Sequence, residues 1–552
     1  MRADNHLVLM LLLVLGPLAH QAFGAEALRI GTTSPIALST VFEQKPGEDG
    51  YLRNLIAPPV VALGKSWRWE CIVCTKLPTL DDKTLAANTL PKRGMVAQFS
   101  IAPQWHWGDG KPVTGHDVAF TLRVLRARRT DPIYTAPQAI RIVVNAKDPR
   151  RFSLELSHIR SDFQTVLAIS LLPAHLERQI FPSTNLDDAS HGIIASNPTH
   201  RGLYYGPYFP TQVTEREVTL SSLDAPIRDI SLRHFTSAAA LNEAVDSHAV
   251  DMTREGDLSL TQIDAITRGS GPQANTKVRA VIAATHAVEH LVVNNRNPVL
   301  ADLSVRQALL YGLDRDRIVS EVYRNYGLKA DQLYHPKDPF ASKSLKTYPL
   351  NPRIAEQLLD GAGWTRGVDG IRRKNDRRLE FVIDSNDSRE RREIFEIIKA
   401  SWHQIGVECT LATHHPSHFT GEVLARAKFR DMALVTLNHP PATGLLVALH
   451  SREIPSSDNG YSGQNVGAFR KKEVDTFLLQ IMRSLDQTRG LEAARSLMLL
   501  YANELPTLPL AFKPKGALIP NWLDNFRIPG HVFASTLDAA LWRRIDSKER
   551  LF

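Results

Sequence analysis

Three short stretches carry residue types that could do chemistry, and the sharpest is "HAVEH" at residues 286–290. It has the H-x-x-E-H spacing of inverted zinc peptidases, in which two histidines one helical turn apart bind zinc and the glutamate acts as a base. That geometry needs a helix, whereas the string runs directly into "LVVNN", which has the composition of a strand. A third ligand has no evident candidate. An exported zinc hydrolase using His286, Glu289 and His290 is therefore only a remote alternative, and no catalytic residue or metal ligand is predicted.

Two further stretches give weaker signals. "HHPSH" at residues 414–418 could bind adventitious metal, but its composition favours a polar turn. "ALGKS" at residues 62–66 resembles the end of a phosphate-binding loop, yet Pro59 stands where the first glycine is required. The chain is therefore predicted to hold no ATPase and no cofactor of its own.

The chain has three cysteines, Cys71 and Cys74 in a C-x-x-C spacing and Cys409 far away. A single C-x-x-C in an oxidising compartment could be a local disulfide, a redox pair or half of a zinc site. Zinc would need two further ligands at suitable spacing, and none is apparent. A structural disulfide between Cys71 and Cys74 is the favoured interpretation.

The first 24 residues read as a targeting segment. A short polar start precedes the apolar run "LVLMLLLVLGPLA", and small residues at Ala22 and Gly24 suit cleavage before Ala25. The run is too short for a permanent membrane anchor. No cysteine stands at the cleavage point to accept a lipid. We expect a soluble, periplasmic protein that is not a lipoprotein.

The chain is too long for one core, since its 552 residues exceed the size at which chains split into domains. Its 43% hydrophobic and 22% charged residues are ordinary for a globular protein. The formal net charge is +8, but the lysines and arginines are scattered rather than gathered in a basic stripe. A nucleic-acid partner is therefore not expected.

The elements that must position a site are clearest at helix starts. In "HWGDGKPVTGHDVAFTLRVL", residues 106–125, Asp109 lies in a glycine-flanked turn. Thr114 is an N-cap, and Asp117 three residues later faces the free N–H groups of the first helical turn. Val118, Leu122 and neighbouring apolar residues recur at helical spacing, which predicts a buried stripe. These acids and histidines are interpreted as scaffold.

Two later stretches follow the same rules. In "DLSVRQALLYGLDRDRIVSEVY" Ser304 and Gln307 are expected to form a capping box. In "YPLNPRIAEQLLDGAGW" Asn351 is the expected N-cap, with Pro352 at the first helical position. Helical and strand-like segments alternate without a fixed repeat, which indicates layered α/β domains with open sheets.

Together these stretches resemble the family 5 extracellular solute-binding proteins, the dipeptide- and oligopeptide-binding proteins of bacterial ABC importers. The resemblance rests on segments that occur in family order: "WGDGKPVTGHDVAFTLRVL", "NNRNPVLADLSVRQALLYGLDRDRIVSEVY", "YPLNPRIAEQLLDGAGW", "NVGAFRKKEVDTFLLQI" and the ending "LPTLPLAF". It implies an α/β, periplasmic-binding-protein-like fold of the class II type, with two lobes, a hinge and a small inserted domain. The implied ranges are a signal peptide at 1–24, a first lobe from 25–65, 200–282 and 505–552, an inserted domain at 66–199 and a second lobe at 283–504.

The resemblance also implies a function. The chain would be a monomer that captures a peptide or peptide-sized ligand between its lobes and delivers it to an inner-membrane ABC permease with separate ATPase subunits. A non-peptide ligand, such as an oligosaccharide, an opine-like molecule or a metal chelate, is the alternative within the same fold. No bond is made or broken in either case.

Ligand contacts are expected on two loops, around Thr33 and Ser34 and at residues 437–439 (Leu437, Asn438 and His439). Peptide binders of this family hold the ligand's α-amino group with an aspartate, and position matching places Asn438 there. An amide cannot supply the opposite charge that a buried ammonium needs. This difference weakens the case for ordinary peptides.

Overall fold

The computed structural model describes residues 27–36, 38, 50–87, 94–127, 140–179, 192–268, 277–438 and 448–545. The leader predicted at residues 1–24 and the predicted ligand residue His439 lie outside these ranges. Three larger sheets and the helices packed on them make up the mixed α/β structure that the sequence predicts. None of the helices in the described ranges is long and apolar enough to cross a membrane.

The first sheet is assembled from distant parts of the chain. Its order is β11-β1-β10-β9-β8, and β1 pairs in parallel with both β10 and β11. Its strands and adjoining helices are β1 (Leu28–Thr32), β8 (Phe209–Val213), β9 (Glu217–Ser221), β10 (Asp229–His234), β11 (Met252–Thr253), α1 (Tyr51–Ile56), α5 (Ala238–Asp246) and α6 (Leu260–Arg268). Leu28 and Ile30 of β1 are fully buried, so the first described strand lies in the middle of this core.

A four-stranded antiparallel sheet, in the order β4-β5-β7-β6, occupies the range in which an inserted domain is expected. Its strands are β4 (Leu85–Ala87), β5 (Met95–Ser100), β6 (Ile140–Val144) and β7 (Arg151–Leu156). Helix α2 (Gly115–Ala127) packs on β6, and its apolar residues Val118, Leu122 and Leu125 are buried. The buried stripe predicted from the sequence is thus confirmed.

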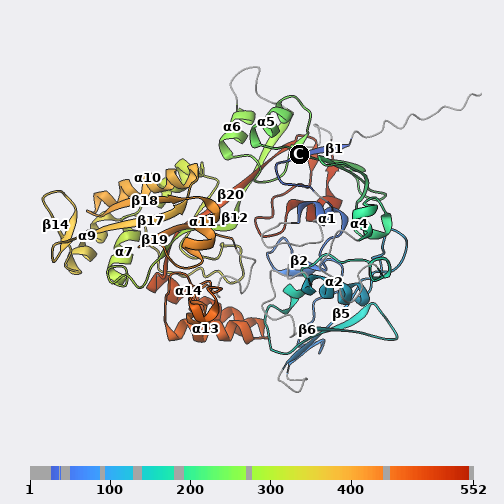
Figure 1. Cartoon of the computed structure of the whole chain (residues 1–552), viewed down its shortest axis with the longest axis horizontal. Helices are drawn as coiled ribbons and strands as arrows, with labels where there is room; N and C mark the ends of the chain where they lie inside the picture. The colour runs from blue at the N-terminus through green and yellow to red at the C-terminus, as the bar shows by residue number, and fades with distance from the viewer. Residues whose placement is uncertain are drawn as a thin grey trace, which may run out of the picture.

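The third sheet has six strands in the order β13-β20-β12-β19-β17-β18. They are β12 (Val278–Val293), β13 (Leu328–Lys329), β17 (Glu380–Asn386), β18 (Glu408–His414), β19 (Met432–Leu437) and β20 (Thr507–Pro520). This sheet and the helices that follow its strands form one half of the molecule, and the first and four-stranded sheets belong to the other. The longer helices of this half are α7 (Leu303–Tyr311), α9 (Pro352–Gly361), α10 (Arg389–Gln404), α13 (Lys472–Arg483) and α14 (Gln487–Glu504). Figure 1 shows this half on the left, with α13 and α14 below it.

The remaining described elements are short. They are β2 (Val61–Leu63), β3 (Trp69–Cys71), η3 (Phe163–Leu167), α3 (Ala174–Glu177), α4 (Ile193–Ser196), η5 (Arg201–Leu203), α8 (Arg315–Arg317), η6 (Ile318–Val322), β14 (Thr365–Arg366), β15 (Arg372–Lys374), β16 (Arg377–Arg378), α11 (Pro416–His418), η7 (Phe419–Leu424), η8 (Ser451–Glu453), η9 (Ser457–Asn459), β21 (Leu523–Asp524), η10 (Ser535–Leu541) and β22 (Arg543–Arg544).

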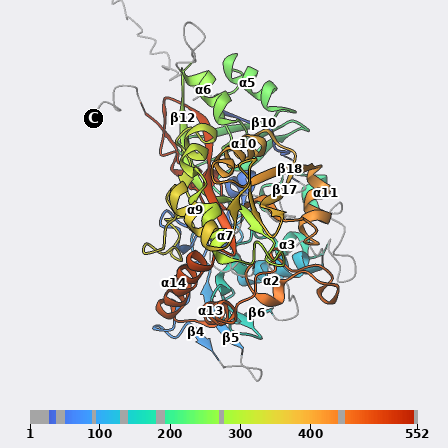
Figure 2. The same ribbon diagram turned by 90° about the vertical axis from the view of Figure 1, so that its left-hand side faces the viewer.

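Two long strands, β12 and β20, join the halves of the molecule. At one end Leu291 and Leu508 belong to the core of the six-stranded sheet, and at the other Val278 and Leu518 pack with α5 and α6. Beyond β20 the chain returns to the core of the first sheet, where Trp542 is fully buried. Figure 2 shows β20 running lengthwise, with α5 and α6 at one end and α13 and α14 at the other.

The helix starts predicted at Asn351 and Thr114 agree with the structure, and the one predicted at Ser304 does not. Asn351 caps α9, since its side chain accepts a hydrogen bond from the Ile354 N–H at 3.1 Å, as predicted. The capping box expected from Ser304 is wrong. Helix α7 begins at Leu303, and the Asp302 carboxylate accepts from the Ser304 N–H at 2.9 Å. The Asp302 carboxylate, two residues before Ser304, competes better for these N–H groups, because its charge is also stabilised by the positive end of the helix dipole.

Asp117 has a wider role than the helix start alone. One carboxylate oxygen accepts from the Thr114 N–H at 2.8 Å, and Thr114 in turn accepts from the His116 N–H. The other oxygen accepts from the Ala174 N–H at 2.8 Å, where α3 begins. Burial raises the pKa of Asp117. One side chain therefore orders the starts of two helices.

We predict that Asp117→Ala lowers the free energy of unfolding by about 2 kcal/mol or more. The substitution leaves buried N–H donors without an acceptor, and each unsatisfied donor costs about 1–3 kcal/mol. Asp109→Ala is the matched control. Asp109 makes a partly exposed pair with His175 at 2.7 Å, and its loss is expected to cost less than about 1 kcal/mol. Chemical denaturation measures both; equal losses would contradict the role given to Asp117.

Candidate functional site

The two long strands part at one place. β12 and β20 lose their register between Ala284 and Val288, where residues 285–287 of β12 face Lys513 alone on β20. The Thr285 hydroxyl donates to the Lys513 carbonyl at 2.8 Å and so supplies a bond that the regular ladder lacks here. Bulges of this kind re-aim side chains and are common beside functional sites.

A cavity of about 300 Å³ opens at this bulge. Its walls come from both long strands, from the end of β19, from the loop after β11 and from the segment after β21. The lining residues are Glu255, Thr285, His286, Ala287, Thr436, Asn438, Lys513, Pro514, Lys515, Ile528, Pro529, Gly530, His531, Phe533 and Ala534. Both halves of the molecule therefore contribute to one cavity, which is a common position for a ligand site.

Gly530 holds the bulge against the C-terminal segment. Its carbonyl accepts from the His286 N–H at 2.7 Å, and His286 Nδ1 lies 3.1 Å from the same oxygen. Its φ is +81°, and a Cβ there would lie 2.8 Å from the Ala284 carbonyl oxygen and 3.2 Å from a ring carbon of Trp67. Only glycine fits this approach.

Trp67 forms the other side of this contact. It stands in the turn between β2 and β3 with a φ of +59°, a conformation that costs a non-glycine residue about 1–2 kcal/mol. Its indole N–H donates to the Pro529 carbonyl at 3.2 Å, and its ring stacks on His335 at 4.5 Å. His531 packs edge-on at 5.8 Å. The packing that offsets the strain thus joins the β2–β3 hairpin to His335, which belongs to the half with the six-stranded sheet.

Burial changes the acidity of both histidines. It lowers the pKa of His335 to about 4, and the Lys337 charge adds to this effect. It lowers the pKa of His531 to about 3, with a further contribution from Arg527. Both rings are therefore neutral near pH 7.

A buried ion network lies behind the cavity. Glu289 of β12 is fully buried, and its carboxylate is 3.0 Å from the Arg391 guanidinium and 3.8 Å from the Lys513 ammonium. The Thr436 hydroxyl donates to the same carboxylate, and Lys513 is also 2.6 Å from Glu390. A buried charge is stable only when it is paired in this way.

This network accounts for the H-x-x-E-H string. Residues 286–290 lie in β12, so the predicted strand is confirmed, and the helical geometry of the zinc motif is absent there. His286 reaches the cavity, whereas Glu289 is committed to Arg391. No group of three His, Cys, Asp or Glu residues suited to a metal ion occurs among the described residues.

The predicted ligand residues are not gathered at one point. Asn438 lines the cavity, while Leu437 points to the apolar cluster on the other face of the sheet. The Thr33 N–H donates to Asp257 at 2.7 Å, and Ser34 bonds the Arg254 guanidinium. Neither Thr33 nor Ser34 is among the residues that line the cavity.

Sequence reasoning missed the part of the cavity on β20. Lys513 and Lys515 flank Pro514 in "AFKPKGAL", and a proline inside a strand pattern marks an edge or a bulge. That signal was available. His531 and Phe533 follow a loop with no comparable pattern, so only the tertiary structure brings them to the cavity.

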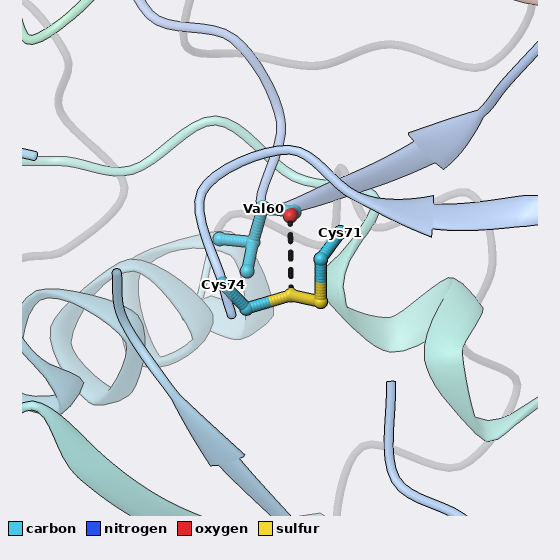
Figure 3. The surroundings of a disulfide bond; sticks show 3 residues. All are labelled: Val60, Cys71 and Cys74. Carbon is cyan, nitrogen blue, oxygen red and sulfur yellow. Dashed lines mark hydrogen bonds between the residues drawn. A yellow bond between two sulfur atoms is a disulfide. The ribbon is translucent and has the colours of Figure 1, made fainter. Parts of the chain in front are cut away.

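A disulfide joins Cys71 and Cys74 at the end of β3 (Figure 3). Cys74 Sγ lies 3.6 Å from the Val60 carbonyl oxygen, and Cys74 forms an isolated bridge with Ile101. The disulfide thus fixes the base of the hairpin that carries Trp67. Cys409 is buried and unpaired, and burial raises the pKa of its thiol to about 12.

Residues 83–442 match the model of the bacterial extracellular solute-binding proteins, family 5, and the chain belongs to this family. A Brucella ovis protein that carries the name of an ABC transporter peptide-binding protein is 25% identical over 356 residues, which cover 62% of each chain. The nickel-binding periplasmic protein of Escherichia coli is 26% identical over 265 residues, 47% of this chain and 48% of that one. The chain thus spans less than two thirds of these curated relatives. The family is one of solute binders, which confirms the prediction of a binding protein rather than an enzyme.

Solved structures show the same fold. The chain aligns over 94% of its length with all of the Brucella suis protein NikA in complex with Fe(III)-EDTA, at 15% identity and a TM-score of 0.74. It aligns over 95% with 98% of the Thermus thermophilus oligopeptide-binding protein complexed with a pentapeptide, at 20% identity and a TM-score of 0.64. The periplasmic-binding-protein-like α/β fold expected from the sequence is therefore confirmed.

We predict that Gly530→Ala destabilises the protein more than Gly370→Ala. Both glycines have a positive φ, +81° and +80°, but nothing lies within 4 Å of a Cβ at Gly370. Each variant should lose about 1 kcal/mol from backbone strain. Only Gly530→Ala should lose more, because of the contact with Ala284. Thermal unfolding compares them, and an equal loss would contradict the close approach.

We predict that the free energy of unfolding decreases as the pH is lowered below about 6.5, and that His335 contributes to this decrease. A histidine with a lowered folded pKa takes up its proton first in the unfolded state, so stability is lost from pH 6.5 down to about 4. These two pKa values correspond to a loss of at most about 3 kcal/mol at pH 4. His335→Phe keeps a stacking ring and should reduce the slope in denaturation curves at pH 7, 6, 5 and 4. An unchanged slope would contradict the prediction.

Proposed function

We propose that this chain is an exported solute-binding protein of an ABC importer. It captures a peptide or other peptide-sized ligand in the cavity at the β12–β20 bulge and delivers it to an inner-membrane permease with separate ATPase subunits. The observation that carries the proposal is the position of the cavity, which is lined from both halves where the two long strands pass between them. Family membership supports the same function. The protein would act as a periplasmic monomer after cleavage of residues 1–24.

Capture would use a hinge movement of the proposed first lobe (25–65, 200–282 and 505–552) and second lobe (283–504), with 66–199 as an inserted domain. Contacts between these units support the proposal. Arg324 is 2.8 Å from Asp264 of α6, and the Ser161 N–H donates to the Met482 carbonyl at 2.9 Å. Such contacts are small enough to open and close around a ligand.

The size of the cavity favours a compact ligand. A volume of about 300 Å³ is at the lower end of the range for ligand sites. A short peptide or a metal chelate fits this size better than a long peptide. The named ligands of similar proteins include nickel, a nickel–histidine complex, Fe(III)-EDTA and a pentapeptide, so both classes occur on this fold.

Asn438 bears on the choice between these classes. It lines the cavity at the position where the family resemblance places the amine-binding aspartate. We propose that the amide gives no charge compensation to a ligand ammonium, so that free-amine peptides bind weakly. Leu437, His439, Thr33 and Ser34 would contribute through backbone groups after closure.

Identification of what co-purifies tests the proposal directly. Native mass spectrometry of protein prepared without denaturation should show a bound small molecule, and adding back that molecule should stabilise the protein by about 2.7 kcal/mol at a hundred times its dissociation constant. A preparation that carries no ligand and is stabilised by none of a peptide, chelate and sugar panel would count against a solute-binding protein. Metal-dependent hydrolysis of a peptide would favour the zinc hydrolase instead.

We predict that Asn438→Asp increases affinity for trialanine but not for N-acetyltrialanine. The new carboxylate would accept a charge-assisted hydrogen bond from the free ammonium. Such a bond contributes about 1.5–3 kcal/mol to the free energy of binding. This corresponds to a tenfold or larger decrease in Kd by calorimetry. Asn145→Asp, at an exposed position after β6 and outside the cavity lining, is the control. No gain with trialanine would mean that residue 438 does not face the ligand's amino end.

A further inference from the structure

Lys515 differs from the other charged residues of the cavity. It lies on β20, its side chain is exposed, and it lines the cavity beside Pro514. Within the described ranges no carboxylate lies within ion-pair distance of its ammonium. Lys515 is therefore a cation at the cavity without a counter-charge from the described part of the chain.

Lys513, two residues away on the same strand, is in a different state. Its ammonium is 2.6 Å from the Glu390 carboxylate and 3.8 Å from that of Glu289. Arg391 completes this group, so that two cations meet two carboxylates. The charge of Lys513 is thus largely offset by the protein, which leaves Lys515 as the cation open to a ligand.

Glu255 is the single carboxylate among the residues that line the cavity, and it is turned toward the protein. One of its oxygens accepts from the Ser535 N–H at 2.7 Å, and the other accepts from the Ser535 hydroxyl at 2.7 Å. Its exposed fraction is 5%. Glu255 therefore does not take the place of a counter-ion for Lys515.

The backbone around Lys515 is held firmly. The Gly256 N–H donates to the Gly516 carbonyl at 2.9 Å, and a Cβ on Gly256 would lie 3.4 Å from Cδ of Lys515. The aliphatic stem of the lysine thus rests against Gly256. A Cβ on Gly516 would lie 2.5 Å from Ile263, so β20 packs closely against α6 at this point. The ammonium is the mobile end of a side chain with a fixed base.

Closure of the two halves around a ligand would remove water from Lys515. A desolvated ammonium without a partner is costly, and a ligand carboxylate would remove that cost with a charge-assisted hydrogen bond. A neutral sugar or amide would leave the charge unpaired. We propose, on the basis of the function proposed above, that Lys515 determines specificity by binding an anionic group, a carboxylate, of the ligand.

The proposal excludes the neutral ligands among the alternatives. An oligosaccharide without acid groups would leave Lys515 without a counter-charge, whereas a short peptide with a free carboxyl end, an opine-like acid or a carboxylate chelate would supply one. Asn438 supports the same preference for an anionic ligand. Among its described lining residues the cavity offers no unengaged carboxylate to a ligand ammonium.

The test compares probes that differ only in charge. Trialanine is paired with its C-terminal amide, and propane-1,2,3-tricarboxylate with its triamide. Thermal shift at low salt and calorimetry are run on the full mature chain, on Lys515→Met and on Lys515→Arg. The control variant is Lys147→Met, since Lys147 is exposed in the turn between β6 and β7 and does not line the cavity.

We expect at least one carboxylate probe to raise Tm and to bind at least tenfold more tightly than its amide. Lys515→Met should remove this preference, whereas Lys515→Arg and Lys147→Met should keep it. The proposal is overturned if the amides bind as well as the acids, if Lys515→Met keeps the preference, or if no carboxylate probe raises Tm. A neutral co-purified ligand would also overturn it while leaving the solute-binding function intact. Absence of any bound or added ligand would instead count against both.

Discussion

Between Ala284 and Val288 the strand β12 takes three residues to pass a single residue of β20, and much of the molecule is arranged around this mismatch. The same two strands join the halves, so neither can be moved without disturbing both cores. The bulge turns His286 and Thr285 toward the cavity. Gly530 then closes the gap from the other side, where no side chain would fit. A local break in strand pairing thus becomes a cavity.

Electrostatics reinforce this arrangement. Glu289, one residue beyond the bulge, carries a charge with no exposed surface and depends on Arg391 and Lys513 for compensation. Because these partners come from α10 and β20, the ion network ties three elements together. Removal of one partner would leave an uncompensated buried charge, which costs about 3–5 kcal/mol. Lys515 is outside this network, and that contrast underlies the proposed preference for an anionic ligand.

Prediction from the sequence succeeded where short-range rules decide the structure. The buried stripe that starts at Val118, the N-cap at Asn351 and the strand at residues 286–290 depend on neighbours along the chain. The start of α7 was placed too late, because Asp302 competes with Ser304 for the same backbone N–H groups. The site was harder to predict. Asn438 lines the cavity, but Leu437 lies on the opposite face of the sheet, since successive residues of a strand alternate.

The sequence by itself determined the α/β class, the family and the starts of α2 and α9, because these depend on periodicity, capping residues and motifs read in order. Only the tertiary structure decided that residue 28 lies beside residue 230, that Trp67 stacks on His335, and that the cavity-lining Lys515 has no counter-charge in the described chain. The physical reason is that burial, strand register and ion pairing join residues hundreds of positions apart. Neither local propensity nor composition carries information about such contacts.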